Sequence, residues 1–451
     1  MVIKATIFAL ATGRGRAGVA VVRVSGPKAA DTIHILTRQD LPEPRAATLR
    51  TLVDVNDKRV LDRALVLWFP GPGSFTGEDI AEFHVHGGRA VITGLTDSLA
   101  KLPGLRVAEA GEFTRRAVEN SKMDLTAAEG LIDLINAETE AQRCQALRQM
   151  GGALSELYEI WRSSLLRAQA MIEVGIDFAD ESDVGDNVTS GVRDILYGTA
   201  KDIANHLNDA QRGERLRDGM HVAIIGAPNV GKSSLLNALV SRNVAIVSDL
   251  AGTTRDILET HLDIEGYPVT IADTAGLRDS NDVIEMEGIR RAEGRAASAD
   301  LKIAMFDCTS KAPDAATMQM VDAATVVAIN KLDLSMPTWD VKCLPPHARC
   351  FFISVQNNVG LDDLFVDLKQ RAELMMDGHG APVITRLRHR TALVEARDAL
   401  DQTMQAMDKQ LDLALVAESL RYVVRAIGRI TGRVDVEDLL DSVFKDFCIG
   451  K

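Results

Sequence analysis

The spacing of hydrophobic and polar residues divides the chain into parts of different texture, of which residues 1 to about 118 are the first. Short apolar runs alternate there with glycine and proline turns. The runs Val19–Val24 and Arg63–Phe69 predict strands, because they are short, apolar and bounded by turn residues. Thr93–Leu102 also lies between turn signals and predicts a helix. This part of the chain is therefore expected to form an α/β or α+β domain.

Two longer regions, from about Leu125 to Arg217 and from about Arg386 to Leu440, have a helical pattern. Their apolar residues recur at steps of three and four, which places them on one side of a helix. Members of this series are Leu131, Leu134, Leu147, Leu154, Leu393, Ala396, Leu400 and Met404. The acidic stretch Asp177–Asp186 interrupts the first region and predicts a loop.

An α/β segment, about residues 218–376, separates the two helical regions. Either helical region alone would leave an apolar stripe exposed, whereas the two together can bury it. We therefore expect the α/β segment to be inserted into one helical domain, and two independent helical hairpins are the alternative. The expected domain boundaries are 1–118, 119–217, 218–376 and 377–451.

Composition excludes several classes of protein. The 451-residue chain has a formal net charge of −13 and only 4% aromatic residues, so it should not bind RNA tightly through bulk electrostatics. Its five cysteines form no zinc-ligand or CxxC pattern. Lys4 and Arg14 break the N-terminal apolar stretch, and no uninterrupted apolar run reaches about 18 residues. We expect no signal peptide, no membrane association and a cytoplasmic location.

Residues 226–233, Gly-Ala-Pro-Asn-Val-Gly-Lys-Ser, are the first sign of chemistry. They follow the apolar run His221–Ile225 and precede the helix-like Ser234–Val240, which is the strand–loop–helix setting of a Walker A loop. Backbone N–H groups of such a loop converge on phosphate oxygens. Lys232 can reach the β- and γ-phosphates, and the Ser233 hydroxyl can ligate Mg²⁺. Taken alone, the segment could also be a chance glycine turn.

Two further segments suit the γ-phosphate side of a nucleotide site. Asp273–Gly276 follows a strand-like run, where the aspartate can hold the Mg²⁺ shell through water and the Gly276 N–H can meet the γ-phosphate. Thr254, within Gly252–Asp256, can supply a second Mg²⁺ ligand.

The base side is represented by Asn330-Lys331-Leu-Asp333, which follows another apolar run. A carboxylate at Asp333 can accept both N–H groups of guanine, a pattern that adenine cannot offer. Asn330 would brace the loop, Lys331 would cover the base, and Ser354 lies where a further base-side loop belongs. These motifs occur in the order of a translation-factor-type GTPase, and an ATPase of the same fold is disfavoured.

The hydrolysis step must depart from the Ras-like scheme. Leu277 occupies the position where Ras-like enzymes use a glutamine to orient water, and leucine cannot hydrogen-bond a water molecule. The side-chain oxygen of Asn229 could ligate a monovalent cation beside the β/γ bridge, although Asn229 could equally be an ordinary turn former. Glu285 could act on the attacking water, but its pattern alone favours a solvated helix face.

Over nearly its whole length the chain resembles the MnmE (TrmE) family of tRNA modification GTPases. The terminal Phe-Cys-Ile-Gly-Lys and the internal Ser-Phe-Thr-Gly-Glu-Asp are much more specific for this family than any GTPase motif. Besides the GTPase motifs, the resemblance rests on Gly13–Gly18, Arg23–Gly26, Ser74–Asp79, His84–Gly88, Gly111–Thr114, Met123–Leu125 and Phe447–Lys451. The chain departs from the family at Gly13-Arg14, where Pro-Pro is usual, and at Ser354-Val-Gln, where Ser-Ala is common.

The resemblance implies an N-terminal α/β domain that binds a formyl-tetrahydrofolate, a discontinuous helical domain and an inserted Ras-like P-loop GTPase domain. It implies a homodimer through the N-terminal domains, and G domains that are activated by transient, potassium-dependent dimerisation. It also implies tRNA as substrate and a flavin-containing partner, MnmG (GidA), in a heterotetramer or larger complex.

The resemblance also assigns residues to the nucleotide and its cations. Asn229 matches the family's potassium ligand, and Glu285 matches the glutamate that orients water. Further potassium ligands correspond to Ser248, Leu250 and Thr253, and the Mg²⁺ ligands to Ser233 and Thr254. The full set expected around GTP, Mg²⁺ and K⁺ is Asn229, Val230, Gly231, Lys232, Ser233, Ser234, Ser248, Asp249, Leu250, Ala251, Gly252, Thr253, Thr254, Asp273, Thr274, Ala275, Gly276, Asn330, Lys331, Asp333 and Ser354.

A second site is implied for 5-formyltetrahydrofolate, whose contacts in the family match Arg23, Glu82, Lys122 and Lys451. Without the family these residues would be ordinary surface charges. Cys448 lies beside the terminal Lys451, and a thiol near a cation has more thiolate character, which suits a catalytic thiol. Its spacing alone favours a small apolar residue packed among its neighbours, and the resemblance restores its catalytic candidacy.

The function predicted from the sequence is a GTPase in tRNA wobble-uridine modification. With the flavoprotein it would install an aminomethyl-type group at position 5 of the uridine, with a one-carbon unit from the folate. Lys232, Glu285 and Cys448 are the candidate catalytic residues. The alternative is a regulatory switch of the ribosome-assembly type, which shares the G motifs but needs neither a folate pocket nor a C-terminal thiol.

Overall fold

The computed structural model describes residues 5–13, 15–177, 182–242, 245–246, 259–272, 294, 298–346, 348–376, 383–409, 413–434, 437–445, 447 and 449–450. The chain divides into two compact units. One unit comprises Met1–Ile132, Met150–Arg162 and Val424–Lys451, and the other comprises Asp133–Gln149 and Ser163–Val423.

The N-terminal part is a six-stranded sheet in the order β3-β4-β5-β2-β1-β6. Its strands are β1 (Thr6–Leu10), β2 (Ala17–Ser25), β3 (Thr48–Val53), β4 (Val60–Phe69), β5 (Ile80–Gly87) and β6 (Leu105–Val107), and its helices are α1 (Ala29–Thr37), α2 (Arg89–Ala100) and α3 (Glu112–Glu119). The predicted strands lie inside β2 and β4, and most of the predicted helix lies in α2, so these predictions are confirmed.

Alternation along these strands decides which side chains reach the candidate site. Val22 and Val24 of β2 join a core that includes Ile33 of α1 and Leu95 of α2. Because side chains alternate between the faces of a sheet, Arg23 points to the opposite face. That face is where the charged residues of β2 and β5 lie.

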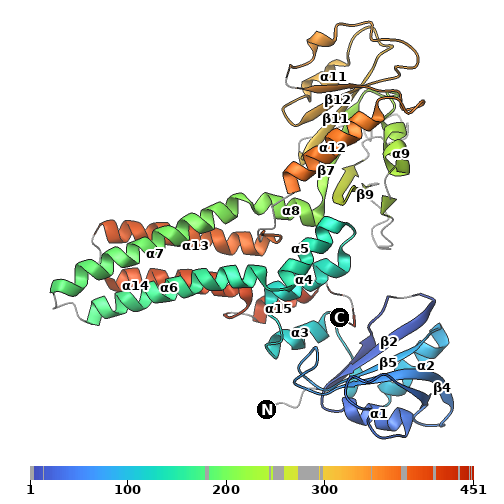
Figure 1. Cartoon of the computed structure of the whole chain (residues 1–451), viewed down its shortest axis with the longest axis vertical. Helices are drawn as coiled ribbons and strands as arrows, with labels where there is room; N and C mark the ends of the chain where they lie inside the picture. Colours follow the sequence, from blue (N-terminus) through green and yellow to red (C-terminus); the bar gives the residue numbers. More distant parts are fainter. Residues whose placement is uncertain are drawn as a thin grey trace, which may run out of the picture. The chain divides into compact units, whose positions relative to one another are not determined.

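The two helical regions form eight helices within the residues that the structure describes. They are α4 (Leu125–Asn136), α5 (Glu140–Met150), α6 (Ala153–Asp177), α7 (Ser182–Asn208), α8 (Ala210–Asp218), α13 (Leu387–Asp408), α14 (Leu413–Thr431) and α15 (Glu437–Phe444). α7 packs directly against α13 (Figure 1). Arg193 of α7 pairs with Asp408 of α13 at 2.7 Å. Helices from the two distant halves therefore lie side by side, as the insertion predicts.

The predicted loop at Asp177–Asp186 is too long. α6 continues to Asp177 and α7 already begins at Ser182, while residues 178–181 lie outside the described part. Acidic residues are favourable near a helix N-terminus, because the end of the helix dipole there is positive. The acidic run was therefore mistaken for a break when part of it begins a helix.

The inserted α/β part is a seven-stranded sheet in the order β13-β12-β11-β7-β10-β9-β8. Its strands are β7 (Met220–Gly226), β8 (Ala245–Ile246), β9 (Glu259–Ile264), β10 (Tyr267–Ala272), β11 (Leu301–Asp307), β12 (Thr325–Asn330) and β13 (Arg349–Phe352). Its helices are α9 (Lys232–Arg242), α11 (Ala315–Gln319), the 3₁₀ turn η1 (Val341–Cys343) and α12 (Leu361–Met376).

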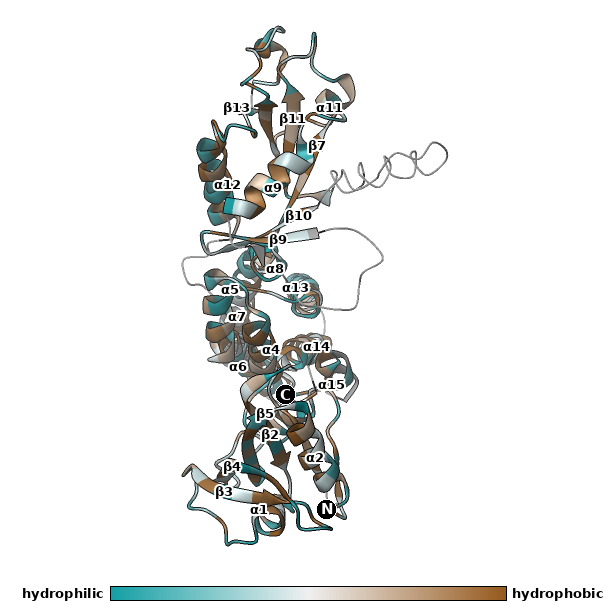
Figure 2. Cartoon of the chain, turned by 90° about the vertical axis from the view of Figure 1, so that its right-hand side faces the viewer, coloured by the Kyte–Doolittle hydropathy of each residue, from teal (hydrophilic) through white to brown (hydrophobic). Residues whose placement is uncertain are grey.

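The strands β13, β12, β11, β7 and β10 run parallel to one another. The central residues of β7 and β11 are hydrophobic (Figure 2), as expected for parallel strands buried on both faces. Ligands of such sheets bind beyond the carboxyl ends of the strands, where the loops after β7, β11 and β12 meet. Among the described helices of the whole chain, none has the length and the unbroken apolar stretch needed to cross a bilayer.

Candidate functional site

The P-loop between β7 and α9 is held by hydrogen bonds to its own backbone. Lys232 Nζ donates to the carbonyl oxygens of Gly226 and Ala227 at 2.8 and 3.0 Å. α9 begins at Lys232, so its first N–H groups and the positive end of its dipole face the loop, which favours a phosphate there. Ser233 and Ser234 lie in this first turn and are exposed, which suits a hydroxyl ligand for Mg²⁺.

Asn330 joins the P-loop to the base-side loops. Its buried Nδ2 donates to the Val230 carbonyl at 2.8 Å, and its Oδ1 accepts from the Val355 N–H at 3.2 Å. Gly231 has a φ of +107°, and a Cβ there would overlap Nδ2 of Asn330. Asn229 adopts a left-handed φ of +62°, a conformation that asparagine tolerates better than most residues. The predicted bracing role of Asn330 therefore has a direct geometric counterpart.

The base-side carboxylate of Asp333 is oriented by a residue of the next loop. Ser354 Oγ donates to Asp333 Oδ1 at 2.5 Å, and the same Oγ accepts from the Asn357 N–H at 3.2 Å. Ser354 is itself fixed by an antiparallel bridge to Val359. A carboxylate held in this way has the geometry to accept paired N–H donors.

These loops surround a cavity of about 760 Å³, which brings together part of the predicted set of residues. Val230, Lys232, Ser233 and Ser354 are not among its lining residues. Its size suits a nucleotide-sized ligand. The lining consists of Asn229, Gly231, Ser234, Asn237, Ala238, Ser241, Asn330, Lys331, Asp333, Leu334, Val355 and Gln356. Asn237 and Ser241 were not predicted; they lie on α9 one and two turns after Ser234, and helical spacing from the P-loop could have indicated them.

Two residues behind the cavity were also missed by sequence reasoning. Asp307 ends β11, and its Oδ2 lies 2.5 Å from Lys331 Nζ. The next residue, Cys308, is fully buried and its thiol donates to the Lys331 carbonyl at 3.0 Å. No motif marks these positions, and only the parallel pairing of β11 with β12 brings them beside Lys331.

Several predicted residues lie outside the described part of the chain. They are Ser248, Asp249, Leu250, Ala251, Gly252, Thr253, Thr254, Asp273, Thr274, Ala275, Gly276, Glu285, Cys448 and Lys451. The proposed roles of these residues in binding cations, water or folate stay predictions.

On the N-terminal sheet, Arg23 and Glu82 are direct register partners of β2 and β5. Both Nε and Nη2 of Arg23 lie 2.9 Å from Oε1 of Glu82, while His84 Nε2 lies 3.2 Å from Oε2. The Arg23 guanidinium lies over the rings of Phe75 and Phe113, at 5.5 and 5.7 Å from their centroids. The structure therefore brings together two of the predicted folate-binding residues beside two aromatic rings.

Lys122, between α3 and α4, contacts the β4–β5 loop that carries Ser74–Asp79. Its Nζ donates to the Pro72 carbonyl at 2.8 Å. The C-terminal tail reaches the same unit, since Ile449 forms an antiparallel bridge with Ala110 and a Cβ on Gly450 would overlap the Leu10 carbonyl. Leu10 directly follows Ala9, the register partner of Arg23 in β1, so the end of the tail lies close to the Arg23 strand.

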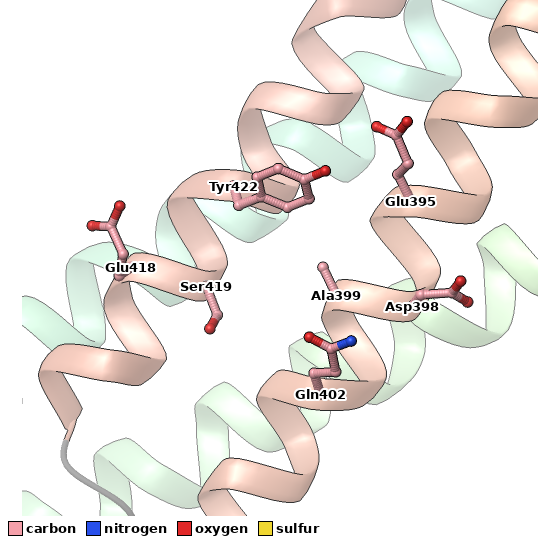
Figure 3. Close-up of a pocket in the computed structure, with 7 residues that line it drawn as sticks. All are labelled: Glu395, Asp398, Ala399, Gln402, Glu418, Ser419 and Tyr422. Atoms are coloured by element: carbon pink, nitrogen blue, oxygen red, sulfur yellow. The ribbon is translucent and has the colours of Figure 1, made fainter.

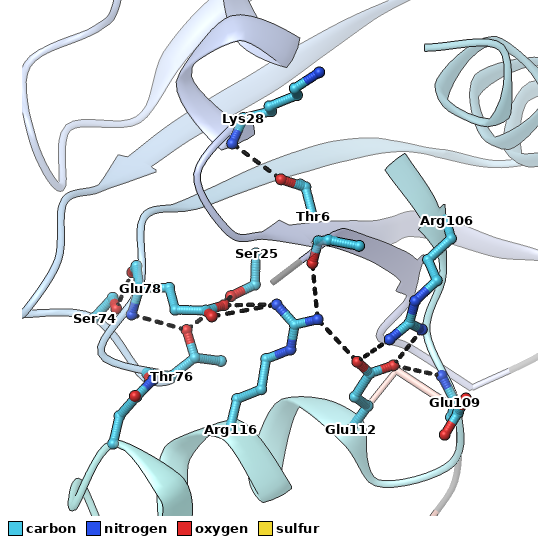
Figure 4. A network of polar contacts seen from close by, with 12 residues as sticks. Thr6, Ser25, Lys28, Ser74, Thr76, Glu78, Arg106, Glu109, Glu112 and Arg116 are labelled. Carbon is cyan, nitrogen blue, oxygen red and sulfur yellow. Dashed lines mark hydrogen bonds and ion pairs between the residues drawn. The ribbon is translucent and has the colours of Figure 1, made fainter. Parts of the chain in front are cut away.

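A buried ionic network lies under this region (Figure 4). Arg116, which is 3% exposed, donates to Glu78 Oε2 and to Glu112 Oε1 at 2.9 Å each. Glu112 also accepts from Arg106, and Glu78 accepts from Ser25. Burial alone would raise the pKa of Glu112, but the hydrogen bonds from Arg106, the Glu109 N–H and Arg116 outweigh it and lower the pKa.

A further cavity of about 590 Å³ lies between α13 and α14 (Figure 3). It is lined by Glu395, Asp398, Ala399, Gln402, Glu418, Ser419 and Tyr422. Arg397 pairs with Asp398 at 2.7 Å, and Arg421 pairs with Glu418 at 3.2 Å and with Glu173 at 3.3 Å. Much of the charge around this groove is therefore balanced within the bundle.

Comparison with known proteins identifies the family of the chain. The family profile described as GTP-binding protein TrmE N-terminus matches residues 6–122, and that of the MnmE helical domain matches residues 125–448. The tRNA modification GTPase MnmE of Rhodospirillum rubrum is 51% identical over 459 residues, which cover 99% of each chain. The chain belongs to the MnmE family.

Other MnmE-family relatives agree. The tRNA modification GTPase MnmE of Parvibaculum lavamentivorans is 52% identical over 447 residues, covering 99% of this chain and 100% of the relative. A mitochondrial 5-taurinomethyluridine tRNA synthase subunit of Danio rerio is 47% identical over 469 residues, covering 99% of this chain and 93% of the relative. As an MnmE-family member the chain is a GTP hydrolase, with an N-terminal α/β domain, a discontinuous helical domain and an inserted P-loop GTPase domain, and these predictions are confirmed.

Proposed function

We propose that this chain is a potassium-dependent GTPase that, with a flavoprotein partner, modifies position 5 of the wobble uridine of tRNA. The one-carbon unit would come from a formyl-tetrahydrofolate held by the N-terminal domain. The observation that carries the proposal is the presence, in one MnmE-family chain, of a nucleotide cavity and of a separate polar site at Arg23 and Glu82.

Each site offers its own chemistry. In the cavity, Lys232 and the first turn of α9 would hold phosphates, Asp333 would read guanine, and Ser233 with Thr254 would hold Mg²⁺. On the N-terminal sheet, Arg23 and Lys122 are cations suited to the glutamate tail of a folate, and Glu82 can accept from the donor edge of a pterin. Lys451 and Cys448 would complete this second site.

The partner, the assembly and the location follow from the family resemblance. We propose a homodimer through the N-terminal domains, a complex with the flavoprotein MnmG (GidA), tRNA as the shared substrate and a cytoplasmic location. The proposed domains are 1–118, 119–217, 218–376 and 377–451. Hydrolysis would rearrange the G domains, and the helical domain would transmit the change.

The test of the proposed folate site distinguishes tRNA modification from GTP hydrolysis. Replacing Arg23 with Ala should abolish binding of 5-formyltetrahydrofolate, measured by titration, and abolish tRNA modification, while GTP hydrolysis persists. Arg59, an exposed arginine of the β3–β4 turn, provides the control, because Arg59→Ala should leave all three unchanged. A wild-type protein that binds no folate would favour the alternative, a regulatory switch of the ribosome-assembly type. Equal loss of GTPase and modification in Arg23→Ala would contradict separate sites.

The potassium site has an independent test. Asn229 lines the cavity in a left-handed conformation, from which its side-chain oxygen would ligate K⁺ beside the β/γ bridge. GTP hydrolysis should be faster in potassium than in sodium at equal ionic strength, and Asn229→Ala should lose that difference. Equal wild-type rates in the two salts would remove Asn229 from the mechanism. Replacing Glu285 with Gln should slow hydrolysis in either salt without weakening GTP binding.

A further inference from the structure

Asp307 lies behind the nucleotide cavity, next to a lysine that lines it. It is the last residue of β11, and its register partner in the parallel strand β12 is Asn330. Lys331, which lines the cavity, directly follows Asn330. The pairing of β11 with β12 therefore places the carboxylate of Asp307 beside the ammonium group of Lys331.

The Asp307 carboxylate has both oxygens in use. Oδ1 accepts from the Thr309 N–H at 2.8 Å and from the Thr309 hydroxyl at 2.7 Å, which fixes the plane of the group. Oδ2 accepts from Lys331 Nζ at 2.5 Å. Burial alone would raise the pKa of Asp307, but the hydrogen bonds from Lys331 and Thr309 outweigh it and lower the pKa. Asp307 is therefore ionised, and its negative charge balances the positive charge of the Lys331 ammonium group.

The backbone of Lys331 is held by the same strand end. Lys331 has a φ of +70°, which costs energy for a side chain other than glycine. Cys308 compensates, because its N–H donates to the Asn330 carbonyl at 3.0 Å and its thiol donates to the Lys331 carbonyl at 3.0 Å. The thiol also lies 3.0 Å from the Ser335 carbonyl, which ties down the chain beyond Asp333. Both ends of the lysine side chain are thus fixed.

We propose that Asp307 is a positioning residue for guanine nucleotides, which holds the stem of Lys331 along the cavity wall where the base lies. A lysine side chain that is free in solution loses rotamer entropy when it is ordered against a ligand. A stem that is already ordered by Asp307 does not lose it on binding, so the complex dissociates more slowly. This inference deepens the proposed nucleotide site and rests on it.

The experiment measures dissociation of a fluorescent GDP from the full-length protein by stopped flow. Asp307→Asn should speed dissociation about tenfold, which corresponds to about 1.4 kcal/mol of binding free energy. Lys331→Ala should have an effect at least as large. The double variant should dissociate no faster than Lys331→Ala alone, because Asp307 acts through Lys331.

The same sheet supplies a matched control. At the opposite end of β11, Lys302 Nζ lies 2.6 Å from Asp322 Oδ2, and Asp322 Oδ1 accepts from the Thr325 hydroxyl at 2.8 Å. This Asp–Lys–Thr arrangement copies the one at Asp307 but lines no part of the cavity. Asp322→Asn should lower thermal stability as Asp307→Asn does, without changing GDP dissociation.

The outcomes are distinct. An unchanged dissociation rate in Asp307→Asn, or additive effects in the double variant, would overturn the positioning role. If Asp322→Asn sped GDP dissociation as much as Asp307→Asn, the effect would come from the general stability of the sheet. That result would also overturn the positioning role. A wild-type protein that binds no guanine nucleotide would instead refute the proposed nucleotide site itself.

Discussion

The nucleotide cavity and the Arg23–Glu82 site differ in how their polar groups are satisfied. In the cavity, the groups that would face a ligand are held from behind: Asn330 by Val230 and Val355, Asp333 by Ser354. On the N-terminal sheet, the predicted ligand-binding groups hold each other, because Arg23 pairs with Glu82.

This difference determines how each site responds to a ligand. A nucleotide meets groups that are already ordered, so little entropy is lost on binding. A folate bound at the proposed N-terminal site would have to compete with the half-buried Arg23–Glu82 ion pair, so the cost of separating these charges would lower its affinity. The cavity should therefore be sensitive to changes in its supporting residues, and the N-terminal site to changes in charge.

The largest effect is expected at the network under the N-terminal site. Arg116→Ala leaves Glu78 and Glu112 without their shared buried cation, which should lower the free energy of unfolding by about 3–5 kcal/mol. The adjacent Arg115 pairs with Asp441 at the surface, so Arg115→Ala should cost only about 0–1 kcal/mol. Thermal and chemical unfolding of the two variants would measure the difference. Equal free energies of unfolding for the two variants would show that the buried network stabilises the fold no more than a surface ion pair does.

A smaller effect is expected at the P-loop. Gly231→Ala would place a Cβ against Asn330 Nδ2 at a φ of +107°, so the hydrogen bond that joins the two loops must break. GDP affinity, measured by calorimetry, should fall on the order of 100-fold, or about 2.7 kcal/mol. Gly198 is the control, because it is exposed in α7 with open space around it, and Ala there should leave affinity unchanged. Retained affinity in Gly231→Ala would mean that Asn330 is not needed to join the loops.

Ser354→Ala should have a more modest effect, because it removes one hydrogen bond that orients Asp333. GDP affinity should fall about fivefold, or about 1 kcal/mol, with no change in folate binding. Ser241 also lines the cavity, but its hydroxyl donates to the Ala238 carbonyl of its own helix, so Ser241→Ala should bind GDP normally. If the two serine variants behaved alike, orientation of Asp333 would not matter.

The smallest effect concerns pH. The pKa of Glu112 is lowered in the folded protein from an ordinary value of 4.5, so its ionised form stabilises the fold above that pH, and the contribution is lost as the pH falls. The stability difference between the wild type and Glu112→Gln should therefore shrink as the pH is lowered through and below 4.5. A difference that stays constant over this range would show that ionisation of Glu112 is not involved.

The parts of the site that the sequence could predict are those that follow one another along the chain. Asn229, Asn330 and Asp333 line one cavity because each motif follows an apolar strand, and strand ends meet at one edge of a parallel sheet. Arg23 and Glu82 are predicted to bind a folate only through the family resemblance, since isolated charges on strands carry no signal of their own.

What escaped prediction depends on pairing between strands and on side-chain contacts in space. Asp307 and Cys308 reach Lys331 because β11 lies beside β12 in a fixed register, and no local pattern specifies that register. The Arg116 network likewise combines residues from β2, α3 and the loop before β5. The acidic run after Asp177 was misjudged because composition cannot distinguish a loop from the first turn of a helix.

The place where the chain enters and leaves the inserted domain has a consequence of its own. A Cβ on Gly213 of α8 would overlap the Ile384 carbonyl, and Arg217 donates to the Thr385 carbonyl at 3.4 Å. The chain segments that enter and leave the inserted domain therefore touch each other just outside that domain. A segment whose two ends meet can be excised and replaced by a short linker without pulling its neighbours apart. A chain in which a few glycines stand in for residues 219–382 should still assemble α7 against α13.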